Sequence, residues 1–211
     1  VDLAARYVPG HQAGLGGDWY DVFALPDGRL GLVIGDVSGH GLGAAVVMGR
    51  LRSALRAYAL TSTDPATVLT HLDHKVHHFE AGSLATVAYA VVSPDRTEAG
   101  ISLAGHLPPV LAAPGHPAAP LTIPVDAPLG LRPGHAARRT TTIPLPPGGL
   151  LVCYTDGLVE RRTEIIDEGI RRLAEAVHPG SAEESCATVM TLLGLEQPAD
   201  DIAMLAVHRK P

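Results

Sequence analysis

Hydrophobic positions along the chain repeat with two periods, one typical of β-strands and the other typical of α-helices. Alternating or continuously apolar segments predict strands at about 2–8, 18–25, 29–36, 84–93, 98–104, 108–113, 138–144, 149–155 and 201–208. A helical period predicts helices at about 42–60, 64–79, 164–177 and 181–193. The elements therefore come as strands, two helices, strands, two helices and a final strand.

This grouping predicts an α+β fold with antiparallel sheets, because a doubly wound parallel sheet would alternate single strands with single helices. Pro26, Asp27 and Gly28 separate the second and third predicted strands, and these residues are typical of the tight turn of an antiparallel hairpin. Such a hairpin would bring Asp18 and Asp36, at its two open ends, side by side.

The length of 211 residues, 46% of them hydrophobic, suits one compact domain over residues 1–211. Between about 105 and 135, frequent Pro and Gly argue against long regular elements. Apolar residues such as Val110 and Leu121 recur there, so an ordered loop with short edge strands is favoured over a domain linker. Because Val1 stands in place of an initiator Met and the alternating stretch from Val1 to Val8 already predicts a strand, we expect a module excised from a longer protein with an N-terminal sensor or regulatory domain.

Charge and composition narrow the classes of partner and compartment. The net charge is -6, and no stretch gathers the basic residues of a nucleic-acid-binding surface, so nucleic acid is excluded as a partner. No apolar run approaches about 18 residues and no secretory leader is present, so neither membrane insertion by this segment nor secretion is expected. Cys153 and Cys186 lack the spacing of a disulfide framework or a zinc knuckle, which favours a cytoplasmic location.

Four aspartates occupy positions suited to a shared site. Asp36 and Asp156 end apolar strands, Asp200 precedes the last strand, and Asp18 follows the glycine-rich stretch 14–17. Carboxylates gathered without Lys or Arg repel one another unless cations neutralise them, and all-oxygen ligation favours Mg²⁺ or Mn²⁺ over zinc. Two such ions about 3.5–4 Å apart could activate a bridging water for in-line attack on phosphorus. The aspartates therefore predict phosphate ester hydrolysis without a covalent enzyme intermediate.

Six blocks, in order along the chain, carry a family resemblance. They are GLGGDWYDVF, GLVIGDVSGHGLGAAVVMGRLRSALRAYA, ATVAYAVVSPD, LAGHLPPVL, LLVCYTDGLVERR and ADDIAMLAVH. Together they resemble the bacterial SpoIIE/RsbU-type serine phosphatase domains of the metal-dependent protein phosphatase (PPM) superfamily, relatives of phosphatase type 2C. The resemblance implies a four-layer α/β/β/α sandwich of two antiparallel sheets flanked by helix pairs, in agreement with the predicted order of elements.

The resemblance also implies how metal ions would be held. Asp36 would bridge two ions, and the main-chain carbonyl of Val37 would also coordinate. Asp18 would act mainly through bound waters. The implied cofactors are two Mn²⁺ or Mg²⁺ ions, with a third left open, and turnover would depend above all on Asp36 and Asp156.

For some of the remaining roles, the resemblance leaves more than one residue of this chain as a candidate. Asp156 and Asp200 are each implied to bind one ion, while the adjacent Asp201 is either a second choice as ligand or an orienting neighbour. In eukaryotic relatives a His two residues after the bridging Asp is a candidate general acid, but here that position is Ser38 and the nearest imidazole is His40. The proton donor is therefore a metal-bound water or His40, unless His40 only shapes its turn. No phosphate-binding arginine is identified.

The predicted substrate is phosphoserine or phosphothreonine on a regulatory protein, and the resemblance implies a phosphorylated STAS-type anti-anti-sigma factor. Two alternatives stay open: a catalytically weak signalling or binding module with the same fold, and a two-metal hydrolase of small phosphate esters. A homodimer is also left open.

The other histidines are interpreted as structural. His71, His74, His77 and His78 lie beside or opposite the apolar stripe of one helix, and positions 71, 74 and 78 share a face, so we expect a solvated face rather than a metal site. His106, in the block LAGHLPPVL, is expected to fix a turn through hydrogen bonds.

Overall fold

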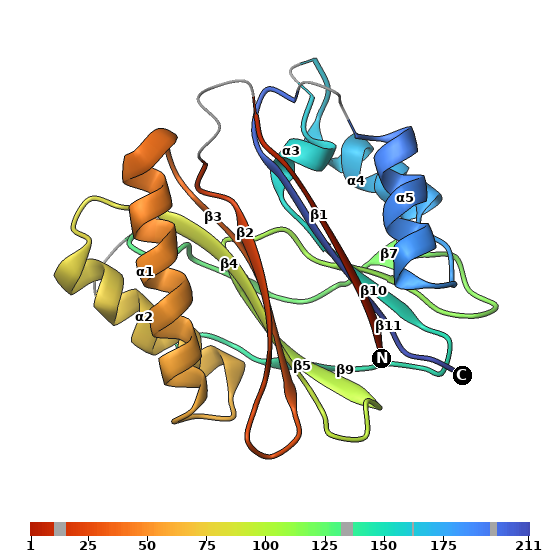
Figure 1. Ribbon diagram of the computed structural model, residues 1–211, viewed down its shortest axis with the longest axis horizontal. Helices are drawn as coiled ribbons and strands as arrows, with labels where there is room; N and C mark the ends of the chain where they lie inside the picture. The colour runs from red at the N-terminus through yellow and green to blue at the C-terminus, as the bar shows by residue number, and fades with distance from the viewer. Residues whose placement is uncertain (11–15, 132–136, 162, 195–197) are drawn as a thin grey trace.

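Two β-sheets lie face to face in the computed structural model, with helices outside them (Figure 1). The structure describes residues 1–10, 16–131, 137–161, 163–194 and 198–211. Sheet A contains, in spatial order, β1 (Asp2–Val8), β11 (Ile202–His208), β10 (Leu150–Tyr154), β6 (Val110–Ala112) and β7 (Ala119–Pro120). Sheet B contains β2 (Trp19–Ala24), β3 (Leu30–Val37), β4 (Ala85–Val92), β5 (Glu98–Ala104) and β8 (Val125–Asp126), with β9 (Thr141–Pro144) also paired to β5. Among these strand pairs, β5 with β8 runs parallel and the others run antiparallel.

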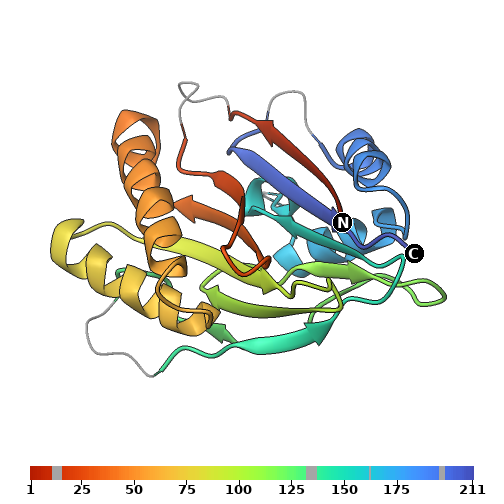
Figure 2. The ribbon, with the colours of Figure 1, turned by 60° about the horizontal axis from the view of Figure 1, so that its bottom comes forward.

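Helices cover the outer face of each sheet (Figure 2). On sheet B lie α1 (Gly41–Ala59) and α2 (Pro65–Phe79); on sheet A lie α3 (Asp156–Val159), α4 (Ile166–Ala176) and α5 (Ala182–Leu192). Buried apolar side chains form three layers, one between the two sheets and one beneath each group of helices. The predicted α+β fold, a four-layer α/β/β/α sandwich, is thereby confirmed. None of the helices in the described ranges has the length and apolar character needed to cross a membrane.

All the predicted strands and helices are present, with small differences at their ends. The elements missed from the sequence are β7, β8 and α3, each of two to four residues, which is too short to show a period. The Pro- and Gly-rich region contains β6, β7 and β8, as expected for a loop with short edge strands; its residues 132–135 lie outside the described part of the chain. His71, His74 and His78 are exposed, as predicted, whereas His77 is half-buried because its ring lies against the Asp73 carboxylate at 3.2 Å.

The predicted hairpin forms from β2 and β3. Gly28 takes a φ of 82° in its turn, a left-handed conformation that glycine adopts without steric cost. The register pairs Trp19 with Gly35 at the open end of the hairpin. One residue further along each strand, Asp18 and Asp36 therefore come side by side.

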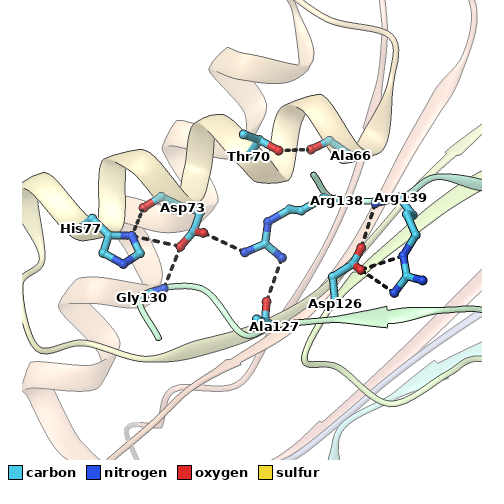
Figure 3. A network of polar contacts seen from close by, with 9 residues as sticks. All are labelled: Ala66, Thr70, Asp73, His77, Asp126, Ala127, Gly130, Arg138 and Arg139. Atoms are coloured by element: carbon cyan, nitrogen blue, oxygen red, sulfur yellow. Dashed lines mark hydrogen bonds and ion pairs between the residues drawn. The ribbon is translucent and has the colours of Figure 1, made fainter. Parts of the chain in front are cut away.

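A buried ion pair anchors the segment after β8 to helix α2 (Figure 3). The guanidinium of Arg138 donates to the Asp73 carboxylate at 2.9 Å and to the Ala127 carbonyl at 2.8 Å. The other Asp73 oxygen accepts from the Gly130 N–H at 2.8 Å. The side chains of Arg138 and Asp73 are only 4% and 7% exposed. The pair therefore fixes α2 against the edge of sheet B.

Replacing Arg138 by Ala should destabilise the fold by about 3–5 kcal/mol, because, among the described residues, it leaves the buried Asp73 carboxylate with only the Gly130 N–H and the His77 ring, 3.2 Å away, as partners. The neighbouring Arg139 provides a matched control: it pairs with Asp126, but its side chain is 57% exposed, so Arg139→Ala should cost about 1 kcal/mol or less. Urea unfolding of both variants measures the difference. Equal losses would contradict the anchoring role of Arg138.

Candidate metal centre

The predicted aspartates lie at strand ends that meet at one end of the sandwich. Asp36 is the seventh residue of the eight in β3, and Asp18 directly precedes β2. On the other sheet, Asp156 begins α3 just after β10, and Asp200 lies just before β11. Figure 1 shows these ends together where α1 and α3 begin. The two sheets thus each contribute carboxylates to a shared region.

Glycines allow these segments to approach closely. A Cβ atom added to Gly17 would lie 2.1 Å from the Val37 carbonyl oxygen, and the Val37 N–H donates to the Gly17 carbonyl at 3.2 Å. A Cβ on Gly157 would lie 2.1 Å from the main-chain oxygen of Asp201. The segment with Asp18 therefore lies against the segment with Asp36, and the segment with Asp156 lies against the segment with Asp201, in both cases through their backbones. Residues 14 and 15 of the glycine-rich stretch lie outside the described part of the chain.

Burial and neighbouring carboxylates raise the pKa values of three of these aspartates. Burial and the adjacent Asp36 raise the pKa of Asp18 to about 9. Burial and the charge of Asp156 raise the pKa of Asp36 to about 6, and burial and the charge of Asp200 raise the pKa of Asp156. One oxygen of Asp18, Oδ2, is buried without a hydrogen-bond partner. Such a cluster favours a bound cation, which would replace the protons and satisfy the unpaired oxygen.

The donor set fits a hard divalent cation, although it does not form a complete cage. Within the described residues, no three His, Cys, Asp or Glu side chains are grouped tightly enough to hold a metal ion by themselves. Mg²⁺ commonly retains several waters and takes only one or two protein carboxylates, so it does not need such a cage. The Val37 carbonyl adds a main-chain oxygen beside Gly17. Oxygen donors with unneutralised charge match Mg²⁺ or Mn²⁺.

The adjacent Asp200 and Asp201 have different environments. The Asp200 side chain is exposed and accepts from the Asp201 N–H at 2.8 Å. Asp201 is 8% exposed, and its carboxylate accepts from the Gly10 N–H at 2.7 Å. A Cβ on Gly16 would lie 1.2 Å from the other oxygen of Asp201, so only glycine fits there. Asp201 thus fastens the segments on either side of residues 11–15, whereas Asp200 stays free to face Asp156.

Tyr7 is a site residue that the sequence did not indicate. It pairs with Ala203 in the β1–β11 register, and its phenol faces the aspartates. Tyr7 as a whole is 39% exposed, but partial burial of its phenol and the charge of Asp201 raise the pKa of that phenol, which stays protonated. No local signal marks Tyr7, because only the pairing of the first strand with the last brings it to the site.

His40 is not joined to the carboxylates. It is the exposed N-cap of α1, makes no side-chain capping hydrogen bond, and lies between Gly39 and Gly41 at φ values of 104° and 77°. No hydrogen bond or ion pair among the described residues links its ring to the aspartates. The arginine nearest to Asp156 in sequence, Arg161, donates to the Leu193 carbonyl at 2.7 Å. The structure therefore brings together the predicted carboxylates and leaves His40 beside them at a turn.

His106 is buried between the sheets, 4% exposed, and both ring nitrogens are hydrogen-bonded. Nδ1 lies 2.8 Å from the Thr86 hydroxyl, and Nε2 lies 3.1 Å from the Tyr154 carbonyl oxygen. The expectation that His106 acts through hydrogen bonds is confirmed, but its partners lie on β4 and β10 rather than within its own turn.

Stability should depend on pH through His106, because burial lowers its pKa to about 4. Unfolded histidine titrates near 6.5, so as the pH falls from about 6.5 towards 4 the unfolded chain takes up a proton that the folded protein excludes. Stability is then lost by at most about 1.4 kcal/mol per pH unit, and no loss from this group occurs above about pH 7. The free energy of unfolding of the wild type minus that of His106→Gln should fall over this window. A difference that is constant from pH 7 to 4 would contradict the burial of a neutral ring.

Comparison with known proteins identifies one matching family. Residues 26–210 match the sequence model of the family described as Stage II sporulation protein E (SpoIIE). Among curated proteins, phosphoserine phosphatase RsbU of Bacillus subtilis (strain 168) is 26% identical over 217 residues, which cover 100% of this chain and 64% of RsbU. The chain spans less than two thirds of the length of the curated relatives it matches.

Solved structures share the fold. The crystal structure of the RsbU and RsbW domains of Rv1364c from Mycobacterium tuberculosis superposes with a TM-score of 0.85 and 31% identity, covering 100% of this chain and 60% of that one. RsbX in complex with magnesium superposes with a TM-score of 0.76 and 16% identity, covering 98% of this chain and 94% of that one. Because RsbX is only 16% identical in sequence, its similarity to this chain shows a shared fold alone.

Proposed function

Because the chain belongs to the SpoIIE family, within the metal-dependent protein phosphatase (PPM) superfamily, we propose that it is a protein serine/threonine phosphatase acting on a phosphorylated regulatory protein. The observation that carries this proposal is the cluster of mutually repelling carboxylates at the ends of strands from both sheets. The similarity to RsbU, a phosphoserine phosphatase that aligns with 100% of this chain, supports the same reaction.

The proposed roles follow from the contacts of each carboxylate. Asp36 interacts with both Asp18 and Asp156, which supports the proposal that it would hold two cations at once. The Val37 carbonyl, Asp156 and Asp200 would complete the protein ligands, with Asp18 contributing mainly through water. Bound Mn²⁺ or Mg²⁺ would supply the positive charge that activates water and offsets the charge of the phosphate. A bound water or His40 would protonate the leaving serine.

For the substrate, we propose a phosphoserine on a STAS-type anti-anti-sigma factor. The support is the SpoIIE/RsbU-type resemblance and the presence of RsbU and RsbW domains together in the similar Rv1364c structure. The same proposal includes the domain organisation: residues 1–211 would form the catalytic domain of a longer cytoplasmic protein with an N-terminal sensor domain. It also includes a homodimer.

Phosphate release from a phosphoserine protein, with and without Mn²⁺, tests the function. We expect turnover that requires the metal, stops with EDTA, and exceeds the turnover of small phosphate esters such as p-nitrophenyl phosphate under the same conditions. Faster turnover of the small ester would favour a general two-metal phosphoesterase instead. No metal-dependent release from either substrate would overturn the proposal.

A second candidate is a catalytically weak PPM-fold module that binds a regulator. One observation favours it: within the described residues the side chains do not form a ready-made metal cage. Calorimetric titration separates the two candidates, since a phosphatase should bind Mn²⁺ below millimolar concentration and a non-catalytic module should show no binding in that range.

A further inference from the structure

A single buried imidazole joins the two sheets close to the metal centre. β5 ends at Ala104, and Gly105 then takes a φ of 68°, where an added Cβ would lie 2.5 Å from Pro128. The chain turns there and His106 enters the interior between the sheets, where its two ring nitrogens meet Thr86 of β4 and Tyr154 of β10.

The two hydrogen-bond partners determine which tautomer the His106 ring adopts. The Tyr154 carbonyl oxygen can only accept, so Nε2 carries the proton and donates to it. Nδ1 then has a free lone pair and accepts from the Thr86 hydroxyl. Both nitrogens are satisfied in one neutral tautomer, so the ring forms a rigid bridge of defined direction from sheet B to sheet A.

Each end of this bridge lies next to a carboxylate of the metal centre. In the β3–β4 register Thr86 is the direct partner of Asp36. Tyr154 is the last residue of β10, and Asp156 follows after the fully buried Thr155. Thr155 is itself held to β11, because its hydroxyl accepts from the Ala203 N–H at 2.8 Å. The span across the imidazole therefore sets how far apart the strands carrying Asp36 and Asp156 lie.

We propose that His106 is a positioning residue that fixes the spacing between Asp36 and Asp156, and thereby the affinity of the centre for divalent cations. This inference rests on the proposed function, since it concerns the same metal centre. The neutral ring suits the position because it adds no positive charge beside a cation site. Burial, which lowers the pKa of His106 to about 4, keeps the ring neutral at physiological pH.

Calorimetric titration with Mn²⁺ tests the inference on the whole chain. His106→Ala removes both hydrogen bonds, and we expect it to weaken Mn²⁺ binding by about 10- to 100-fold, as for other residues that orient ligands from outside the first coordination sphere. Thr86→Val, which removes one hydrogen bond with little change of shape, should cause a smaller loss. His106→Gln can still donate to the Tyr154 carbonyl and should restore part of the affinity. At saturating Mn²⁺, kcat should recover in all three variants with KM unchanged.

The control separates positioning from simple loss of stability. Ile101 is 1% exposed in the same layer between the sheets and pairs with Ala90, away from the strand ends that carry the aspartates. Ile101→Ala should lower the midpoint of thermal unfolding and leave the Mn²⁺ affinity within about twofold of the wild type, because Ile101 pairs with Ala90, four residues along β4 from the Thr86 that faces Asp36. If His106→Ala does not fold, Thr86→Val and His106→Gln carry the comparison.

Two results would overturn the inference: unchanged Mn²⁺ affinity in folded His106 and Thr86 variants, or an equal loss in Ile101→Ala. Failure of the proposed function looks different, because the wild type itself would then bind no Mn²⁺ at millimolar concentration.

Discussion

Asp36→Asn and Asp156→Asn should each reduce Mn²⁺-dependent turnover of a phosphoserine protein by about a thousandfold or more, which corresponds to roughly 4 kcal/mol of transition-state stabilisation. Asparagine keeps nearly the same shape but loses the charge that attracts a cation. The fold should tolerate both changes, because burial and neighbouring carboxylates already raise the pKa values of Asp36 and Asp156. Removing one negative charge relieves this repulsion. Phosphate release measures the expected loss of turnover, and thermal unfolding of the same variants checks that the fold is intact.

Asp27→Asn is the matched control for these substitutions. Asp27 lies in the β2–β3 turn with its side chain 49% exposed and paired with Arg29, so its loss should leave turnover unchanged. Mn²⁺ should also raise the unfolding temperature of the wild type and of Asp27→Asn, but not that of Asp36→Asn, because a ligand stabilises only a state that binds it. Wild-type turnover in both Asp36→Asn and Asp156→Asn would rule out the metal centre as the site of catalysis.

The carboxylates could be located from the sequence because their positions depend on local signals. A run of apolar residues predicts β3. Asp36, next to the last residue of that strand, must therefore lie where the strand leaves the sheet. The turn at Gly28 predicts the hairpin, and the hairpin brings Asp18 next to Asp36. Each step uses residues close together along the chain. The fold class followed in the same way from the order of strands and helices.

The features of the site that could not be predicted from the sequence depend on pairings between segments far apart along the chain. The hydrogen bond from Gly10 to Asp201 and the place of Tyr7 result from the β1–β11 register, which joins the two ends of the chain. His106 lies 20 residues from Thr86 and 48 from Tyr154, and no local pattern predicts that one ring bonds to both. Asp200 and Asp201 both precede β11, and what distinguishes them is the contact of Asp201 with Gly10, 191 residues away along the chain, and with Gly16, which no local pattern predicts.

Asp200 and Asp201 should therefore give opposite results when each is replaced by Ala. Asp200 is exposed, and its charge raises the pKa of Asp156. Asp200→Ala should therefore weaken Mn²⁺ binding by about a hundredfold, which is the upper end of the losses seen for residues that only orient ligands. Its stability should change little, because the side chain is exposed. Asp201→Ala leaves the Gly10 N–H without its acceptor and should cost about 1–3 kcal/mol of stability.

Urea unfolding and Mn²⁺ calorimetry on both variants distinguish a ligand from a fastening residue. Asp201→Asn is the informative third variant, because its side-chain carbonyl can still accept from the Gly10 N–H while its charge is gone. If Asp201 only fastens the chain, Asp201→Asn should keep near-wild-type stability and should lose far less Mn²⁺ affinity than Asp200→Ala. A full loss of Mn²⁺ binding in stable Asp201→Asn, with wild-type binding in Asp200→Ala, would reverse the assignment. The ligand would then be the aspartate that also holds Gly10 and lies against Gly16, and metal binding would be coupled directly to the segment that connects β1 to β2.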